Sequence, residues 1–233
     1  MNHASIDAWR VRTPSRTWEV LEPALPRFGI TRVGDVTRLD ILGVPVAIAY
    51  RPLAATLSVS QGKGITLRHA FVSAAMEAVE LWHAENPVPG PVLSAVPAGD
   101  LDLPYEISEL DQYPGSLLTD RTPLDWVTAI GLVSGQEIPV PLDAVAFRQA
   151  AGWRPPGLRT SSNGLASGNN WAEAAVHGLI PAHPEGGATA ARHHRTEAVG
   201  RHLGRRPPGT VLARHSPWLR RPRVRPTDLR RRP

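Results

Sequence analysis

The segment from Thr66 to Glu85 constrains the fold most, because it has no proline or glycine in a chain that contains 24 prolines and 20 glycines. A segment of this length without helix breakers predicts a long α-helix, with Thr66 as its N-cap and Pro87 just beyond its end. Apolar side chains recur in it at helical spacing and predict one buried stripe. That stripe comprises Leu67, Ala70, Phe71, Ala74, Ala78, Leu81 and Trp82.

A second stripe on the same helix is polar. Ser73, Glu77 and Glu80 stand at i, i+4 and i+7, so a hydroxyl group and two carboxylates share one face. Most helix glutamates are solvated surface charges, and this alternative stays open. However, no lysine or arginine stands at a helical neighbour of the two glutamates to relieve their repulsion. An uncompensated carboxylate pair flanked by alanines indicates a divalent cation, and hard oxygen ligands favour Mg²⁺.

Lys63 is the only lysine in the chain, because the other 25 basic residues are arginines. Lysine is a compact charge suited to phosphate, and its neighbours Gly62 and Gly64 let a ligand approach the backbone. We expect a strand over residues 57–60 to lead into a Gly-Lys-Gly turn that faces the start of the helix, where free N–H groups also attract anions. A plain surface turn is the alternative.

Composition narrows the classes of protein. Cysteine is absent from the 233 residues, which excludes disulfides, thiolate nucleophiles and cysteine-based zinc sites. The most apolar stretch, Ile41 to Tyr50, is too short to span a bilayer. We therefore expect a soluble cytoplasmic protein without a membrane partner. The net charge is divided, since residues 1–180 carry −5 and residues 181–233 carry +10.

The remaining patterns predict an α+β fold in which helices pack on a mixed sheet. The expected elements, in order, are a helix over residues 15–28 that Gly29 closes, strands over 30–36 and 44–50, loops over 86–123, a hairpin over 126–142 and a short helix over 143–151. We interpret the hairpin and the short helix as scaffold.

Residues 161–180 form a polar, glycine-punctuated loop that enters a second helix. Its Asn-Gly and Gly-Asn pairs permit positive φ, so the backbone can wrap around a ligand. Asn169 or Asn170 caps the helix, which presents Glu173 and His177 at i, i+4. Such a pair can bind a metal, but a surface histidine or a satisfied core histidine is the commoner outcome.

Taken in order, these motifs resemble the YcaO family. The matching motifs are residues 37–46, Arg51-Pro52, residues 58–64, Ser73 with Glu77 and Glu80, and residues 162–169 with Glu173 and His177. The resemblance runs from about residue 29 to residue 180 and covers the N-terminal half of the family domain. The segment from Glu80 to Glu85 is similar to the branch found beside TfuA-like partners. The resemblance therefore implies a truncated YcaO-like α+β domain.

By resemblance, the activity would be ATP- and Mg²⁺-dependent activation of a peptide backbone amide, in modified-peptide or bacteriocin-type biosynthesis. A cysteine, serine or threonine nucleophile would give an azoline by cyclodehydration, and a sulfide source would give a thioamide. The implied partners are a peptide substrate, a TfuA-like or leader-peptide-binding protein, and a second copy in a homodimer. The implied nucleotide-binding residues are Lys63, Ser73, Asn169 and Glu173, and the implied Mg²⁺ ligands are Glu77, Glu80 and Glu173.

Two departures from the family pattern open an alternative function. Family members commonly have arginine where Leu81 stands, and glutamates where Pro181 and Pro184 stand. The truncated chain would then be inactive, and a non-catalytic scaffold of a peptide-modifying complex is the alternative. We expect residues 1–28 to form a helical segment and residues 29–180 to form the partial YcaO-like domain.

Residues 181–233 contain 13 arginines and 8 prolines with almost no periodicity, which predicts a disordered tail. One interpretation is a basic arm that binds nucleic acid or an acidic partner. The other, which we favour, is out-of-register translation of a GC-rich gene, because the composition changes where the family helix should continue. Nucleic acid is accordingly not an expected partner.

Overall fold

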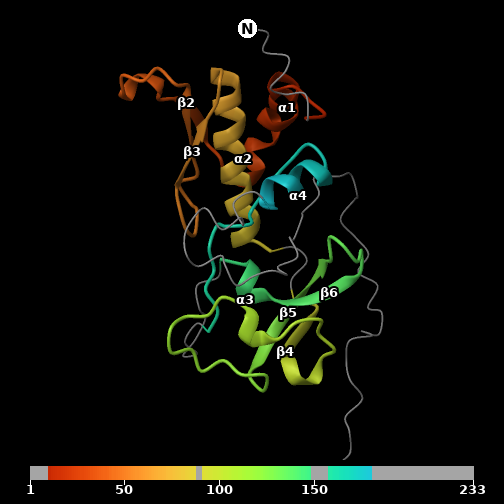
Figure 1. Cartoon of the computed structure of the whole chain (residues 1–233). Coiled ribbons are helices and arrows are strands. Elements are labelled where there is room, and N and C mark those ends of the chain that lie inside the picture. Colours follow the sequence, from red (N-terminus) through yellow and green to blue (C-terminus); the bar gives the residue numbers. More distant parts are fainter. Residues whose placement is uncertain (1–9, 88–90, 148–156, 180–233) are drawn as a thin grey trace, which may run out of the picture.

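The computed structural model describes residues 10–87, 91–147 and 157–179 (Figure 1). The expected α+β class is confirmed. The helices are α1 (Pro14–Leu21), α2 (Leu67–Glu85), α3 (Leu142–Val145) and α4 (Trp171–Leu179), with 3₁₀ segments η2 (Glu22–Phe28), η3 (Thr37–Leu39), η4 (Ala98–Asp100) and η5 (Ile107–Glu109). The strands are β1 (Arg32–Asp35), β2 (Val46–Tyr50), β3 (Val59–Lys63), β4 (Leu93–Pro97), β5 (Pro123–Ile130) and β6 (Glu137–Pro141).

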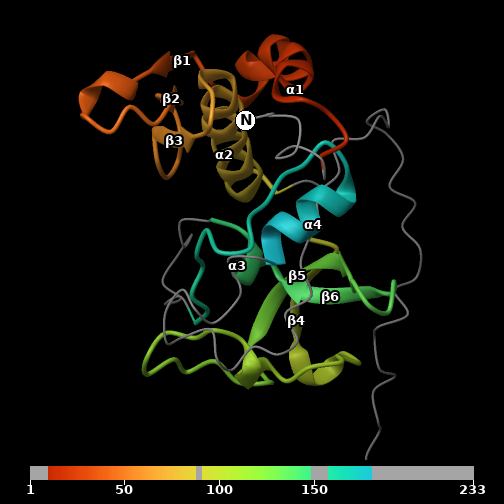
Figure 2. The same cartoon turned by 45° about the horizontal axis from the view of Figure 1, so that its top comes forward.

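The strands form two antiparallel sheets, in the orders β1-β2-β3 and β4-β5-β6. A mixed sheet needs a parallel pairing, and the described strands contain none. The two sheets lie towards opposite ends of the molecule, and α4 lies between them (Figures 1 and 2). The backbone N–H of Phe147 donates to the carbonyl of Ala84 at 2.9 Å, so the chain after the second sheet is tied to the end of α2.

The main core lies between α2, the first sheet and the N-terminal helices. Small residues of β2, Ala47 and Ala49, face the alanines of α2, and larger side chains of α1 and η2 close the side of this layer. The predicted helix over residues 15–28 is α-helical only in its first half. Pro23 and Pro26 remove backbone donors from the second half, which is the 3₁₀ segment η2 and ends at Gly29 with φ 70°.

Helix α2 confirms the central prediction. The Thr66 hydroxyl oxygen accepts a bond from the backbone N–H of His69, as an N-cap does, and the helix ends before Pro87. The buried stripe is shifted from the predicted one. Leu67 was expected inside but is 39% exposed, whereas Val79 is buried. Ala70 in the same first turn is fully buried, so Leu67 lies on the outer side of that turn, and periodicity alone placed it wrongly.

The expected Gly-Lys-Gly turn is wrong, because strand β3 continues through Lys63. Gly62 and Lys63 pair with Ala47 and Val46 of β2. A Cβ atom on Gly62 would lie 2.0 Å from the backbone nitrogen of Ala74 in α2. Gly62 therefore allows α2 to pack closely against β3, and the chain turns only after Lys63.

The loops predicted over residues 86–123 contain a strand that we missed. Strand β4 pairs with β5, although the register shifts between Leu93 and Val96, and Ala95 has φ 53°. Its partner contributes Trp126, which is fully buried and donates its indole N–H to the carbonyl of Val96 at 2.8 Å. An irregular five-residue strand has too little alternation to be recognised before its partner is known.

The predicted hairpin is confirmed as β5 and β6. The predicted helix over residues 143–151 is only the single turn α3 in its described part, and residues 148–151 lie outside the described residues. The predicted disordered tail over residues 181–233, with Pro181 and Pro184, also lies outside them. Within the described ranges, every helix is too short or too polar to cross a membrane.

Candidate functional site

The positive charge of Lys63 acts on Glu77 across the β3–α2 junction. Lys63 is the last residue of β3 and is exposed. Glu77 is an exposed residue in the middle of α2. Burial raises the pKa of Glu77, and the positive charge of Lys63 lowers it. Ser73 is exposed one turn earlier on the same helix. Ser73 and Glu77 are therefore exposed together on one face of α2, and Lys63 acts on the Glu77 end of this stripe.

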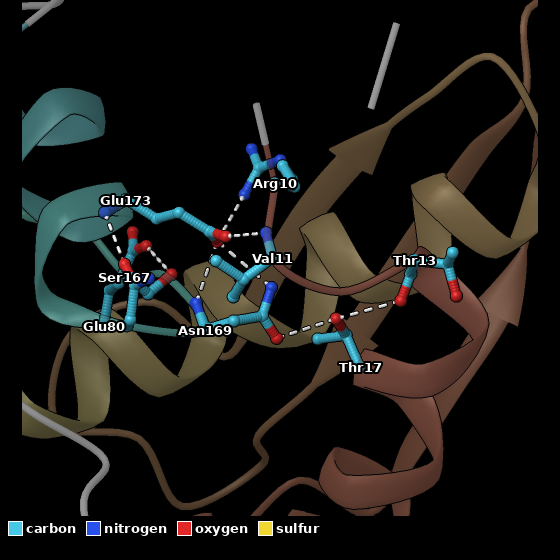
Figure 3. Close-up of polar contacts among 9 residues, drawn as sticks. Arg10, Val11, Thr13, Thr17, Glu80, Ser167, Asn169 and Glu173 are labelled. Atoms are coloured by element: carbon cyan, nitrogen blue, oxygen red, sulfur yellow. Dashed lines mark hydrogen bonds and ion pairs between the residues drawn. The ribbon is translucent and has the colours of Figure 1, made fainter. Parts of the chain in front are cut away.

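Glu80 connects this stripe to the loop before α4. The Ser167 hydroxyl group donates a short hydrogen bond to the Glu80 carboxylate (Figure 3). Burial raises the pKa of Glu80 to about 7, the hydrogen bond from Ser167 opposes this change, and the charge of Glu77 adds to it. The two carboxylates therefore repel one another in the folded chain, as the sequence indicated.

The loop before α4 is shaped by two different glycines. Gly164 has φ 86°, a conformation that favours glycine. Gly168 has no positive φ, but a Cβ atom there would lie 2.5 Å from the backbone nitrogen of Ala174 and from Cβ of Glu173. Of the two expected caps, Asn170 performs the role, because its side-chain oxygen accepts from the backbone N–H of Glu173 at 2.9 Å.

Asn169 and Glu173 are bound to each other. The Glu173 carboxylate accepts from the backbone N–H of Asn169 at 3.0 Å and from its side-chain amide at 3.1 Å. The other carboxylate oxygen accepts from the backbone N–H of Val11 at 2.6 Å, and the Arg10 guanidinium lies 3.6 Å from the oxygen that Asn169 binds (Figure 3). Burial would raise the pKa of Glu173, but the bonds from Asn169 and Val11 and the charge of Arg10 hold it below its ordinary value.

The structure does not bring all the expected metal ligands together. Within the described ranges, no group of three His, Asp or Glu side chains is arranged to hold a metal ion. Glu77 and Glu80 lie on α2, while Glu173 is 4% exposed and turned to the N-terminal segment. His177, the other member of the possible metal pair, is exposed.

Sequence reasoning missed the contribution of the N-terminal segment. Arg10, Val11 and Thr17 reach Asn169 and Glu173 across more than 150 positions of the chain. The Thr17 hydroxyl group donates to the side-chain oxygen of Asn169 at 2.8 Å. These contacts join segments that are far apart in the sequence, so no pattern of neighbouring residues predicts them.

Comparison with known proteins decides the family. The profile of the family described as "YcaO cyclodehydratase, ATP- and Mg2+-binding" matches residues 61–180. The chain belongs to the YcaO family. That match begins at Gln61 in β3 and covers both the α2 stripe and the loop entering α4. ATP and Mg²⁺ are the ligands that the family description names.

Relatives of this YcaO chain are longer. It is 47% identical over 174 residues to an uncharacterized protein of Mycobacterium tuberculosis, covering 73% of the chain and 39% of the relative. It is 42% identical over 172 residues to an uncharacterized protein in the tfuA 3' region of Rhizobium leguminosarum bv. trifolii, covering 73% and 40%. The chain therefore spans about two fifths of the length of the curated relatives it matches.

Solved structures support the same fold. YcaO from Methanopyrus kandleri bound with AMPPCP and Mg²⁺ superposes with a TM-score of 0.51 at 24% identity, covering 74% of this chain and 42% of that one. A heterocyclase in complex with substrate and cofactor superposes with a TM-score of 0.58 at 17% identity, covering 74% and 28%. Both likenesses establish the fold.

Glu80→Gln is expected to remove a pH dependence from the stability of this YcaO chain. The folded-state pKa of Glu80 is raised from its ordinary value near 4.5 to about 7. Between these two pH values the Glu80 carboxyl group is therefore protonated in the folded chain and ionised in the unfolded chain. Stability should therefore fall as pH rises through this window, by at most about 3 kcal/mol.

Denaturant unfolding without divalent cations, at about pH 5 and about pH 8, measures the effect of this pKa shift. The difference between the two unfolding free energies should shrink in Glu80→Gln. The control Glu19→Gln changes an exposed glutamate of α1 and should keep the parent's difference. An unchanged difference in Glu80→Gln would contradict the prediction.

Proposed function

We propose that this chain contributes to ATP- and Mg²⁺-dependent activation of peptide backbone amides. The observation that carries the proposal is the Lys63–Glu77–Glu80 arrangement, inside the region that matches the family profile. Lys63 at the end of β3 acts electrostatically on Glu77, and Glu77 in turn repels Glu80, so the charge of this carboxylate pair is compensated only in part. A bound cation would complete this charge arrangement.

The residues present fit a magnesium ion at α2. Glu77 and Glu80 offer hard oxygen donors at adjacent turns, and burial, which raises the pKa of each, makes their charged forms costly unless a cation lies nearby. Glu173 would be a further ligand, but its carboxylate is engaged by Arg10, Val11 and Asn169. We infer that Glu77 and Glu80 form the primary part of the metal site.

In this proposal the chain positions groups and neutralises charge. Lys63 would bind nucleotide phosphate as a point charge, and Ser73 and Asn169 would orient the nucleotide by hydrogen bonds. Bound Mg²⁺ would supply charge neutralisation on the phosphates. Ser167 holds the Glu80 carboxylate in place, so that its orientation does not depend on the ligand. Little acid–base chemistry is required of the protein itself.

The reacting group would be a substrate amide. After a nucleophile adds to the amide carbon, the amide oxygen takes the γ-phosphoryl group, and phosphate then leaves with that oxygen. A side-chain nucleophile of the peptide would yield an azoline, and an external sulfide would yield a thioamide. The relative in the tfuA 3' region supports a TfuA-like partner and the thioamide product, while the heterocyclase likeness supports the azoline.

Lys63→Ala and Glu77→Gln should each weaken binding of Mg·AMPPCP about tenfold or more. Each change removes one charged contact from the proposed site, and a hydrogen bond to a charged group contributes about 1.5 to 3 kcal/mol. Isothermal titration calorimetry measures the affinity, and circular dichroism verifies that both variants keep the fold. Both positions are exposed, so neither change should unfold the chain.

Glu19→Gln serves as the control, because Glu19 is an exposed helix glutamate that forms a surface ion pair with Arg16. It should bind nucleotide like the parent chain. Unchanged affinity in both site variants would refute the site assignment. A parent chain that binds no Mg·AMPPCP would refute the enzymatic proposal and favour the non-catalytic scaffold.

A further inference from the structure

The segment from Arg10 to Thr17 contacts Asn169 and Glu173 at the start of α4, the two residues proposed to bind the nucleotide and the metal. Val11 donates its backbone N–H to Glu173 at 2.6 Å, and Arg10 lies 3.6 Å from the other oxygen of the same carboxylate. Thr17, one turn into α1, donates to Asn169 at 2.8 Å. Figure 3 shows these contacts converging on Glu173 and Asn169 from the N-terminal side.

These contacts leave the Glu173 carboxylate little capacity for another ligand. A carboxylate has about four acceptor positions. Here three N–H groups occupy three of them, two from Asn169 and one from Val11, and Arg10 adds a positive charge beside them. The Glu173 side chain is 3% exposed. A cation can therefore reach this carboxylate only if the N-terminal contacts open.

Two features of the segment suit it to opening. Residues 10–13 lie outside any helix or strand, and the Val11 side chain is 61% exposed, so little apolar burial holds the segment in place. The Arg10 side chain is 33% exposed and lies 3.6 Å from the Glu173 carboxylate, which is longer than a hydrogen bond, so this contact is a weak one. The polar contacts to Glu173 thus contribute to keeping this stretch closed.

We propose that Arg10 and Val11 form a latch on Glu173 that sets the affinity of the site for divalent cations. The inference rests on the proposed function, because it assumes that Glu173 is a metal ligand. The closed latch and a bound cation compete for the same carboxylate, so the apparent affinity is the intrinsic affinity scaled by the fraction of open molecules. The bond from Thr17 to Asn169 keeps the segment nearby, which favours reclosure when the cation leaves.

The test compares variants that remove one latch contact with matched variants that keep it. Val11→Pro deletes the backbone N–H that Glu173 accepts, whereas Val11→Ala retains it. Arg10→Ala deletes the charge beside Glu173, whereas Arg12→Ala removes a neighbouring exposed arginine. Isothermal titration of the full chain with Mg²⁺ alone measures the affinity. We expect it to rise about tenfold in Val11→Pro and about threefold in Arg10→Ala, and to stay unchanged in both controls.

Hydrogen exchange gives a second readout that does not depend on a variant folding correctly. If the latch opens, Mg²⁺ should speed exchange of the Val11 amide in the parent chain, while amides in the middle of α2 stay protected. Unchanged exchange at Val11 with saturating Mg²⁺ would overturn the latch. So would unchanged Mg²⁺ affinity in both Val11→Pro and Arg10→Ala.

Glu173→Gln separates failure of the latch from failure of the proposed function. It should weaken Mg²⁺ binding and abolish the gain from Val11→Pro in the double variant. If Glu173→Gln weakens binding but neither latch variant tightens it, the latch is wrong and the proposed function stands. If Glu77→Gln and Glu173→Gln leave the Mg²⁺ affinity unchanged and Lys63→Ala leaves the Mg·AMPPCP affinity unchanged, the proposed function is wrong and the latch falls with it.

Discussion

Arg51→Ala is expected to destabilise the folded chain by about 3 to 5 kcal/mol, because it leaves a buried carboxylate without its cation. The Arg51 and Glu85 side chains form an ion pair and are only 4% and 3% exposed. Arg51 also donates from Nε to the carbonyl of Phe28 at 3.1 Å, and Glu85 accepts from the backbone N–H and the hydroxyl group of Thr56. The pair thus joins η2, the loop after β2 and the end of α2.

Urea unfolding followed by circular dichroism measures this loss. Arg16→Ala is the matched control, since Arg16 forms an ion pair with Glu19 on α1 in which the side chains are 74% and 58% exposed. That change should cost less than about 1 kcal/mol. If Arg51→Ala and Arg16→Ala lowered the unfolding free energy equally, burial would not determine how much the Arg51–Glu85 pair stabilises the fold.

Gly62→Ala should cost about 3 kcal/mol or more, at the upper end of the range for overpacked cores. The added Cβ atom would lie 2.0 Å from the backbone nitrogen of Ala74 and 2.3 Å from the carbonyl oxygen of Ala70. No rotamer change relieves a clash with helix backbone, so α2 must move away from β3. Lys63 and Glu77 would then separate, and nucleotide binding should weaken together with stability.

Gly34→Ala is the control in the same sheet. A Cβ atom on Gly34 of β1 would meet only the end of the Arg32 side chain, at an ordinary 3.7 Å. Its unfolding free energy should stay within about 1 kcal/mol of the parent value. A Gly62→Ala chain as stable as Gly34→Ala would mean that α2 does not approach β3 as closely as the structure shows.

Residue pattern alone predicted the parts of the fold that depend on neighbouring residues. The long helix from Leu67 to Glu85, its Thr66 cap and the β5–β6 hairpin are confirmed, because capping, helical periodicity and turn chemistry act over a few positions. The YcaO resemblance was likewise carried by ordered local motifs, and the family match confirms it. The roles assigned to Lys63, Ser73, Glu77, Glu80, Asn169 and Glu173 stay predictions.

Contacts between distant segments could not be predicted in this way. Strand β4 is recognisable only beside β5, and Gly62 is explained by the backbone of α2 and not by a turn. The same applies to Arg51, which the sequence presented only as part of a family motif and which the structure places in a buried ion pair.

The sequence by itself determined which chemical groups this protein has for binding phosphate and a divalent cation, namely one lysine and a helix face with two carboxylates. Only the tertiary structure decided which of those groups are free to act. Glu77 and Glu80 are compensated only in part on α2, by Lys63 and by the hydrogen bond from Ser167, while Glu173 is satisfied by a segment 162 residues away. The physical reason is that residue type sets what a carboxylate can bind, whereas its burial and its competing hydrogen-bond donors are properties of the packed chain.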